Sequence, residues 1–204
     1  GAGKVAGLVT ERDLVRTGLA RAGTSNQPLR EAMRPGIPHV SADATELECA
    51  AMMRDHTTRH LLVEDRGQIV GIVSMRDIIQ HIIDSKTPVA VYVTPTGSRA
   101  ASAGFFILLS ADVAAMAPGT HTGAASPVAA IGGYPVTLDE TIKNKILNDV
   151  KAYLRSYAVQ RGRNVELAET AITEAKAFTA QEALTGKLCD VIASSKDDLL
   201  AQLN

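Results

Sequence analysis

The sequence has no tryptophan, and aromatic residues make up only 3% of its 204 residues. Its core must therefore be built mainly from aliphatic side chains. It has only two cysteines, Cys49 and Cys189, which lie too far apart for a metal-binding spacing, so we expect two small buried residues and no metal site. The formal net charge is −1, which gives no sign of a nucleic-acid partner or of an anionic-membrane patch.

The sequence also lacks an apolar run long enough to span a membrane. The longest run covers residues 100–109, before Ser110 and Asp112 interrupt it, which is short of the ~20 residues that a span needs. No signal-peptide pattern opens the chain, and its first residue is Gly1, so we expect a piece of a longer parent whose localisation stays unknown. A composition of 46% hydrophobic and 21% charged residues is ordinary for one or two soluble globular domains.

An internal repeat is present in the first part of the chain. Residues 3–15 match residues 67–79 position by position. Such a repeat indicates a supersecondary module that needs a second copy to bury its face. Each copy is expected to form a strand and then a helix whose first turn holds a hydroxyl residue and, three positions later, an aspartate: Thr10 with Asp13, and Ser74 with Asp77.

Between the copies, residues 46–55 have the spacing of a helix, and residues 59–63 and 68–73 are typical of a strand hairpin. This βαββα region resembles a CBS domain over residues 29–83, and residues 3–20 resemble the tail of a preceding copy. The resemblance implies an adenine nucleotide, AMP or ATP, with its ribose and phosphate at the hydroxyl and aspartate positions: Thr10, Asp13, Ser74 and Asp77. A helix N-terminus favours a phosphate, but helix capping explains the same residues, and both interpretations stay open.

A second candidate site lies where a buried strand is expected to turn into an apolar helix. Residues 89–93 are apolar and β-branched, residues 94–97 break the strand, and residues 103–109 form an apolar run. Ser102 lies at this turn, among small residues that admit a substrate backbone. The free N–H groups of a first helical turn can stabilise an oxyanion, so Ser102 suits a nucleophile. Tight packing of a helix on a strand would also explain these small residues.

The second half of the chain resembles the NfeD family of membrane-bound, ClpP-class serine proteases over residues 84–203. Several stretches carry the resemblance in order: residues 87–104, 115–120, 122–125, 145–149, 152–153, 155–156, 161–164, 179–184 and 190–193. It implies a ClpP/crotonase-like α/β domain in which Ser102 is the nucleophile and Lys145, on the following long helix, is the general base. No cofactor is required for that chemistry.

The general base raises a choice between two lysines. Helical periodicity alone places Lys143 nearer the centre of the apolar stripe, whereas the family spacing selects Lys145. A lysine base must be neutral at working pH, so burial must lower its pKa. The resemblance also implies an earlier strand and helix with a Pro-Gly-Gly oxyanion loop. No such loop precedes Ser102, which leaves the Ala103 N–H as the candidate donor.

The remaining elements are expected in this order: a strand at residues 112–116, a small-residue loop at 118–128 with an exposed His121, a flexible connection at 132–133, a long amphipathic helix at 140–161, helices at 165–175 and 180–185, a strand at 189–193 and a helix from residue 197.

The sequence thus predicts an α/β protein with a CBS pair, its first copy truncated, at residues 1–83 and a truncated protease-like domain at residues 84–204. The expected function is cleavage of apolar peptides by a Ser-Lys dyad, with the CBS region as a regulatory nucleotide site. The alternative is a non-catalytic nucleotide-binding module with an inactive protease-like half. Expected partners are a peptide or membrane-protein substrate, an adenine nucleotide and further copies of this chain, because the incomplete modules leave strand edges open.

Overall fold

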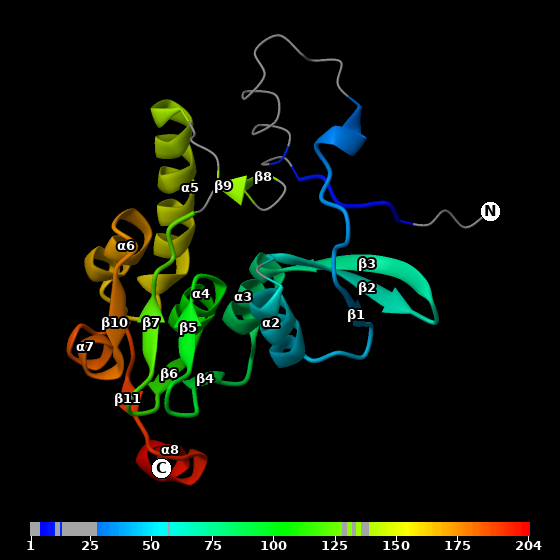
Figure 1. Ribbon diagram of the computed structural model, residues 1–204. Coiled ribbons are helices and arrows are strands. Elements are labelled where there is room, and N and C mark those ends of the chain that lie inside the picture. Colours follow the sequence, from blue (N-terminus) through cyan, green and yellow to red (C-terminus); the bar gives the residue numbers. More distant parts are fainter. Residues whose placement is uncertain are drawn as a thin grey trace. The chain divides into compact units, whose positions relative to one another are not determined.

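The computed structural model describes residues 5–10, 13, 28–56, 58–127, 130–131, 134–135 and 139–204. The chain divides into two compact units, whose elements are labelled in Figure 1. The first unit comprises Gly1–Val73 with Ala129–Leu138, and the second comprises Ser74–Val128 with Asp139–Asn204. The architecture is mixed α/β, which confirms the predicted fold class. The domain boundary after residue 83 stays a prediction; the units by themselves divide after Val73.

The expected βαββα order is found in β1 (His39–Ser41), α2 (Glu46–Asp55), β2 (His60–Asp65), β3 (Gln68–Ser74) and α3 (Met75–Asp84). The sheet order is β1-β2-β3, with β1 and β2 parallel. A capping box between Thr45 and Glu48 begins α2. Arg66 and Gly67 both have positive φ, as a tight two-residue hairpin turn requires. A short 3-10 helix, Leu29–Glu31, precedes this module, and β8 (Ala130–Ile131) pairs with β9 (Tyr134–Pro135) in the same unit.

Helix α3 opens the second unit and has a strongly amphipathic sequence. The Ser74 hydroxyl accepts from the Asp77 N–H, and the Asp77 carboxylate accepts from the Ser74 N–H, so a capping box begins α3. Four apolar side chains at helical spacing are buried: Met75, Ile78, Ile79 and Ile82. This face packs against α4 (Ala103–Ser110), so α3 belongs to the core of the second unit.

The second unit contains two three-stranded sheets. The first has the order β11-β6-β4, where β4 (Ala90–Val93) and β11 (Val191–Ile192) both run parallel to β6 (Val113–Met116). The second has the order β10-β7-β5. There, β5 (Arg99–Ala101) is parallel and β10 (Ala177–Thr179) antiparallel to β7 (His121–Gly123).

The second sheet corrects the prediction of a loop at residues 118–128. Three residues of that stretch form the central strand β7, and His121 is its first residue. His121 is exposed, as predicted, but it lies on a strand. The strand forms because it has partners on both sides, although its small and polar side chains give no apolar alternation. The predicted connection at residues 132–133 lies outside the described residues.

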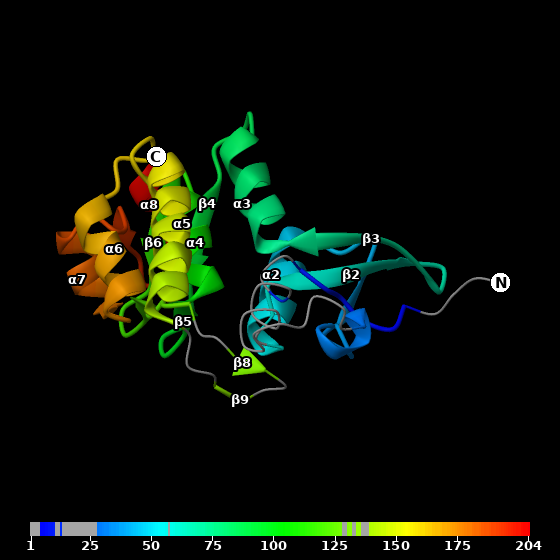
Figure 2. The ribbon, with the colours of Figure 1, turned by 90° about the horizontal axis from the view of Figure 1, so that it is seen from above.

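The helices of the second unit follow the predicted order. Helix α5 (Glu140–Ala158) ends one turn earlier than expected. It packs beside α6 (Val165–Thr173) and against α4, and α4 also contacts α3 (Figure 2). Helix α7 (Ala180–Thr185) follows β10 directly and begins with a Thr179–Glu182 capping box. Most of the core is aliphatic, as expected, and Leu108, Leu109, Leu154 and Ile172 are all 0% exposed. Its largest buried side chains are nevertheless aromatic: Phe105, Phe106 and Tyr157. Both cysteines are buried, and burial raises the pKa of each thiol.

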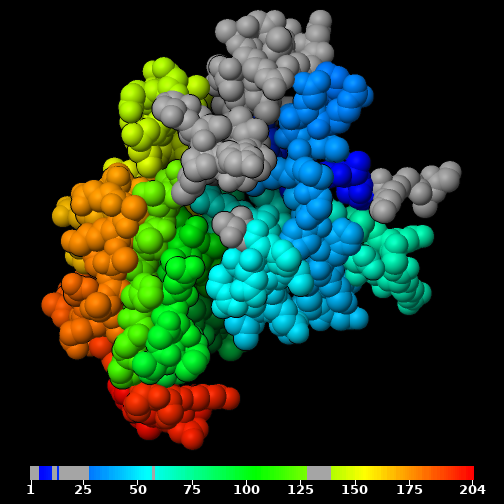
Figure 3. Space-filling view, in the orientation of Figure 1, coloured from blue at the N-terminus to red at the C-terminus, as the bar shows by residue number. Residues whose placement is uncertain are grey.

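Helix α8 (Lys196–Leu203), shown in red in Figure 3, projects from the end of the second unit. It is held by Leu199, which clusters with Ala115 and Ala193 and packs against Tyr92 and Val191. The Tyr92 hydroxyl donates to the carbonyl of Ala193 at 2.7 Å, which ties β4 to the segment before α8. Among the described residues, no helix combines the length and apolar character needed to cross a membrane.

Candidate active site

Ser102 lies between β5 and α4, where the backbone takes an uncommon conformation. Its φ is 52° and its ψ is −114°, outside the regions that residues with a Cβ atom usually adopt. The residue is exposed, and its hydroxyl makes no capping bond to α4. The hydroxyl is therefore not committed to the helix start that it precedes.

Two backbone hydrogen bonds hold this turn. The Ser102 N–H donates to the carbonyl of Gly123 at 3.1 Å, and the Phe105 N–H donates to the carbonyl of Ser102 at 3.1 Å. Residues 105–110 of α4 are all buried, so the helix after the turn has little freedom to move. A strained serine on a sharp strand-to-helix turn is the arrangement that exposes a nucleophile in many hydrolases.

The predicted oxyanion donor, Ala103, is the first residue of α4. Its N–H donates none of the backbone hydrogen bonds between elements found in the described part of the chain, whereas the neighbouring Ser102 N–H is occupied by Gly123. The N-terminal N–H groups of a helix lack partners within the helix and carry a partial positive charge. The Ala103 N–H can thus donate a hydrogen bond to an anionic oxygen beside Ser102.

The predicted base, Lys145, lies on the N-terminal half of α5, where it is exposed. The burial expected of a neutral lysine is therefore not found in the isolated chain. Lys143 is exposed as well, and its ammonium lies 3.3 Å from the carboxylate of Glu140 one turn earlier. The buried part of α5 comes later, at Leu154, Tyr157 and Ala158. No hydrogen bond joins Ser102 to either lysine among the described residues.

The predicted nucleotide residues of the first unit form a preorganised cluster. Asp13 is fully buried and accepts from the Thr10 N–H at 3.0 Å, from the Thr10 hydroxyl at 2.6 Å and from Arg34 Nε at 3.0 Å. Burial by itself raises the pKa of Asp13, but these hydrogen bonds and the Arg34 charge outweigh it, so the pKa is lowered. Asp13 therefore stays ionised at neutral pH.

A cavity of about 400 Å³ lies in the same unit. Its size is in the range of small-molecule sites. Its wall is mainly apolar and comes from the segment before Thr10, the segment before β1, the start of β1, and β2: Val5, Ala6, Gly7, Gly36, Ile37, His39 and Leu62. The other predicted pair, Ser74 and Asp77, belongs to the second unit, where the two residues cap α3 and Asp77 is exposed.

The comparisons with known proteins agree with both resemblances. Residues 29–84 match the family model described as the CBS domain.

The membrane-bound protease PH1510 of Pyrococcus horikoshii is 39% identical over 131 residues, which cover 64% of this chain and 29% of that protein. A solved membrane-bound stomatin-specific protease, a lysine-to-alanine mutant in complex with a substrate peptide, is 30% identical with a TM-score of 0.58. That likeness covers 81% of this chain and 77% of the other. A serine-to-alanine mutant of such a protease is 29% identical, also with a TM-score of 0.58, over 81% of this chain and 82% of that one.

The chain is homologous to this NfeD-like membrane-bound protease. It also contains a CBS-domain region. The chain spans less than a third of the full length of the PH1510 protease. The fold of the chain is also similar to that of the solved protease, with a TM-score of 0.58, which agrees with the protease-family resemblance of the sequence.

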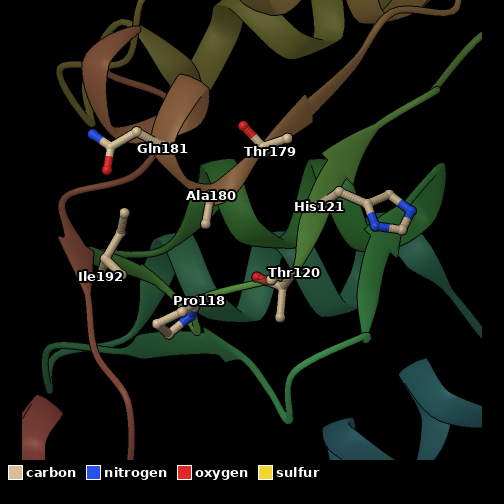
Figure 4. Close-up of a pocket in the computed structure, with 8 residues that line it drawn as sticks. Pro118, Thr120, His121, Thr179, Ala180, Gln181 and Ile192 are labelled. Carbon is tan, nitrogen blue, oxygen red and sulfur yellow. The ribbon is translucent and has the colours of Figure 1, made fainter.

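The protease-homologous unit also has a cavity of about 540 Å³. It is lined by the segment before β7, the start of β7, the junction of β10 with α7, and β11: Pro118, Gly119, Thr120, His121, Thr179, Ala180, Gln181 and Ile192. Figure 4 shows the His121 ring pointing away from Pro118 and Ile192. His121 begins β7, whereas the residue that contacts Ser102, Gly123, ends it, so the cavity and the serine lie at opposite ends of the strand.

Two residues that bear on the candidate sites escaped the sequence-based prediction. Gly123 supplies the carbonyl that holds Ser102. In the sequence it lay in the loop expected at residues 118–128 and in the 122–125 stretch of the family resemblance, and neither signal gave it a role beside Ser102. Arg34 pairs with Asp13 across 21 positions, and nothing in the local pattern of either residue indicates that partner.

The backbone of Ser102 predicts an unusual response to substitution. We expect Ser102→Gly to be more stable than Ser102→Ala by about 1 kcal/mol, because glycine accepts the positive φ without strain. Urea unfolding of both variants measures the difference. At Ser156, an exposed position within α5, the order should reverse, with glycine less stable than alanine by about 0.5–1 kcal/mol. Equal stability of the two Ser102 variants would show that the turn is not strained.

Proposed function

We propose that the protease-homologous unit is a serine endopeptidase in which Ser102 is the nucleophile and Lys145 the general base. The observation that carries the proposal is the strained, exposed Ser102 at the start of a buried helix, in a chain homologous to a serine protease. The structures of the relatives, one of them with a bound substrate peptide, support the same reaction class.

In the proposed reaction, Ser102 Oγ attacks the carbonyl carbon of a peptide bond while Lys145 Nζ accepts the hydroxyl proton. The oxygen of the tetrahedral intermediate becomes negative and is stabilised by the Ala103 N–H. Lys145 then gives its proton to the leaving amine, and the acyl-enzyme ester forms. Lys145 then takes a proton from a water molecule whose oxygen attacks the ester carbonyl, and it returns that proton to Ser102 Oγ as the ester bond breaks and the carboxylic acid leaves.

The exposure of Lys145 bears on the class of substrate. A general base must be neutral to accept a proton. An apolar peptide that covers this part of α5 would exclude water and favour the neutral amine. The half-buried Ile142 and Ile146, on the turn that carries Lys145, supply an apolar surface for such a peptide. We therefore propose apolar peptides or apolar segments of membrane proteins as substrates.

The dyad predicts that either of two single substitutions strongly reduces peptide hydrolysis. Ser102→Ala should reduce kcat/KM for a fluorogenic apolar peptide to background, and Lys145→Ala should reduce it by about 10²–10⁴-fold, the usual contribution of a general base. Lys143→Ala is the matched control, because Lys143 is an exposed lysine on the same turn of α5. Equal activity of all four proteins would refute the dyad, and loss of activity only in Lys143→Ala would reassign the base.

We also propose that the CBS region binds an adenine nucleotide, AMP or ATP. The support is the match to the CBS family, the hydrogen bonds that hold the buried Asp13 to Thr10 and to the exposed Arg34, and the apolar cavity in the same unit. A carboxylate that stays ionised can accept hydrogen bonds from ribose hydroxyls. We propose Ser74 and Asp77, at the start of α3 in the second unit, as a second candidate pair for phosphate and ribose. A non-catalytic nucleotide-binding protein is the alternative function, and the exposure of Lys145 favours it.

Nucleotide binding is testable by titration calorimetry with AMP and with ATP. We expect saturable binding that weakens at least about tenfold in Asp77→Ala, because a lost hydrogen bond to a charged group costs about 1.5–3 kcal/mol. Asp84→Ala, at the other end of α3, is the control and should bind as the native chain does. Absence of heat with both nucleotides, together with an unchanged melting temperature, would remove nucleotide binding from the proposed function.

We further propose that the chain forms a homo-oligomer. Strand β4 is an end strand of its sheet, so one of its edges has no neighbour among the described strands. In the first unit, β3 exposes 59% of Val70 and 49% of Ile72, and α2 exposes 79% of Leu47. A second copy of the chain would cover these apolar side chains.

Light scattering at several protein concentrations tests this assembly. We expect the mass of a dimer or a larger species, and Val70→Lys combined with Ile72→Lys should shift it towards the monomer. Lys substitution of Val159, exposed by 66% at the end of α5, serves as the control for added charge. A native chain that stays monomeric at about 100 μM and unfolds cooperatively would refute the proposal.

A further inference from the structure

Gly123 occupies a backbone position that no other residue fits without strain. Its φ is 106°, in the region that side chains rarely adopt. A Cβ atom at this position would lie 2.4 Å from the carbonyl oxygen of Lys176 and 3.0 Å from the Cα of Ala177. Both are backbone atoms of the segment that forms β10, so they cannot rotate away as a side-chain tip would.

The segment after Gly123 is held against the same neighbours. The Ala124 N–H donates to the carbonyl of Lys176 at 2.8 Å, and the Ala125 N–H donates to the carbonyl of Ala171 at 2.8 Å. Ala124 also has a positive φ of 45°. The end of β7 therefore bends closely over β10 and the end of α6, and the missing side chain of Gly123 is what allows this approach.

On the other side of β7, the carbonyl of Gly123 accepts a hydrogen bond from the N–H of Ser102 at 3.1 Å. This hydrogen bond has two effects at the candidate active site. It holds Ser102 at its strained φ of 52°, and it occupies the Ser102 N–H, which leaves the Ala103 N–H as the donor beside the hydroxyl. The bend of β7 over β10 is thus transmitted to the nucleophile through one carbonyl group.

We infer that Gly123 is a positioning residue: its close approach to Lys176 and Ala177 sets its carbonyl, and that carbonyl sets the backbone of Ser102. This role goes beyond the proposed dyad, which does not include β7. Its kinetic consequence rests on the proposed function, whereas its structural consequence does not. A Cβ atom at position 123 would push the end of β7 away from β10 and weaken the hydrogen bond to Ser102.

The first test is amide hydrogen exchange, followed by NMR, in the native chain and in Gly123→Ala. The Ser102 amide should be protected in the native chain. In Gly123→Ala its exchange should accelerate at least about tenfold more than that of Leu109, deep in α4. An unprotected Ser102 amide in the native chain would overturn the inference without any variant.

Two control variants separate this role from a general loss of stability. Gly162→Ala also places alanine at a positive φ, of 66°, but in open space. Gly186→Ala creates a clash in another part of the unit, 2.9 Å from the backbone carbonyl of Glu182 and 2.3 Å from the movable tip of Leu167. Both should destabilise the chain while the exchange of Ser102 changes no more than that of Leu109. If they accelerate Ser102 selectively, Gly123 has no special role.

The second test is kinetic. A displaced nucleophile lowers the rate of the chemical step more than substrate binding, so Gly123→Ala should reduce kcat about 10–100-fold with KM changed less than about threefold. Gly162→Ala and Gly186→Ala should keep kcat within about threefold of the native value. An unchanged kcat in Gly123→Ala would refute the inference. If Ser102→Ala and the native chain are equally active, the proposed function fails, and hydrogen exchange alone then decides the role of Gly123.

Discussion

Helix α4 sets the main constraint on the second unit, because it has no polar face. Its sequence is apolar from Ala103 to Leu109, and every residue from Phe105 onward is buried. Such a helix must be covered on all sides. The sheets, α3 and α5 provide that cover, and Tyr157 of α5 is buried with its hydroxyl 3.4 Å from the carbonyl of Phe106. Because the whole helix is fixed, the residue at its start is fixed too, and that residue is Ser102.

Burying α4 also buries its C-terminus, where backbone carbonyls have no partner within the helix. Two arginines that follow α5 supply the donors. Arg161 Nε donates to the carbonyl of Ser110 at 2.8 Å, and Arg163 Nη2 donates to that of Ala111 at 3.0 Å. The charges of both arginines are balanced, by Asp112 and Asp190 respectively. Positive charge at a helix C-terminus also complements the helix dipole. The Arg161-Gly162-Arg163 stretch is part of the family resemblance of the sequence. Its two arginines supply hydrogen-bond donors to the end of α4 that lies opposite Ser102.

The sequence predicted the elements whose signals are local and strong. Three elements were found almost as expected, because periodicity and turn residues determine them: the helix at residues 46–55, the strand at residues 89–93 and the apolar helix α4. The sheet β10-β7-β5 was missed, because its three-residue strands contain mainly small or polar residues and depend on neighbours distant in sequence. For the same reason Ser102 could be predicted as a nucleophile at a strand-to-helix turn, but the Gly123 carbonyl that holds it could not. Burial of Lys145 was required by the chemistry and is not found, since an amphipathic stripe does not show what covers each turn of a helix.

Helix α3 links the CBS-domain region to the protease-homologous unit. Its N-terminus carries the Ser74–Asp77 capping box of the CBS repeat, and its buried face packs on α4, the helix that begins after Ser102. Near the same N-terminus, the Arg76 guanidinium lies 4.7 Å from the ring centroid of Tyr153 and 3.3 Å from the carboxylate of Asp149, both on α5. Asp149 is one helical turn from Lys145 on the same face of α5. A single helix thus contacts the elements that carry both members of the proposed dyad. A shift of the start of α3 would therefore disturb its packing on α4 or its contacts with α5, because a close-packed interior transmits strain.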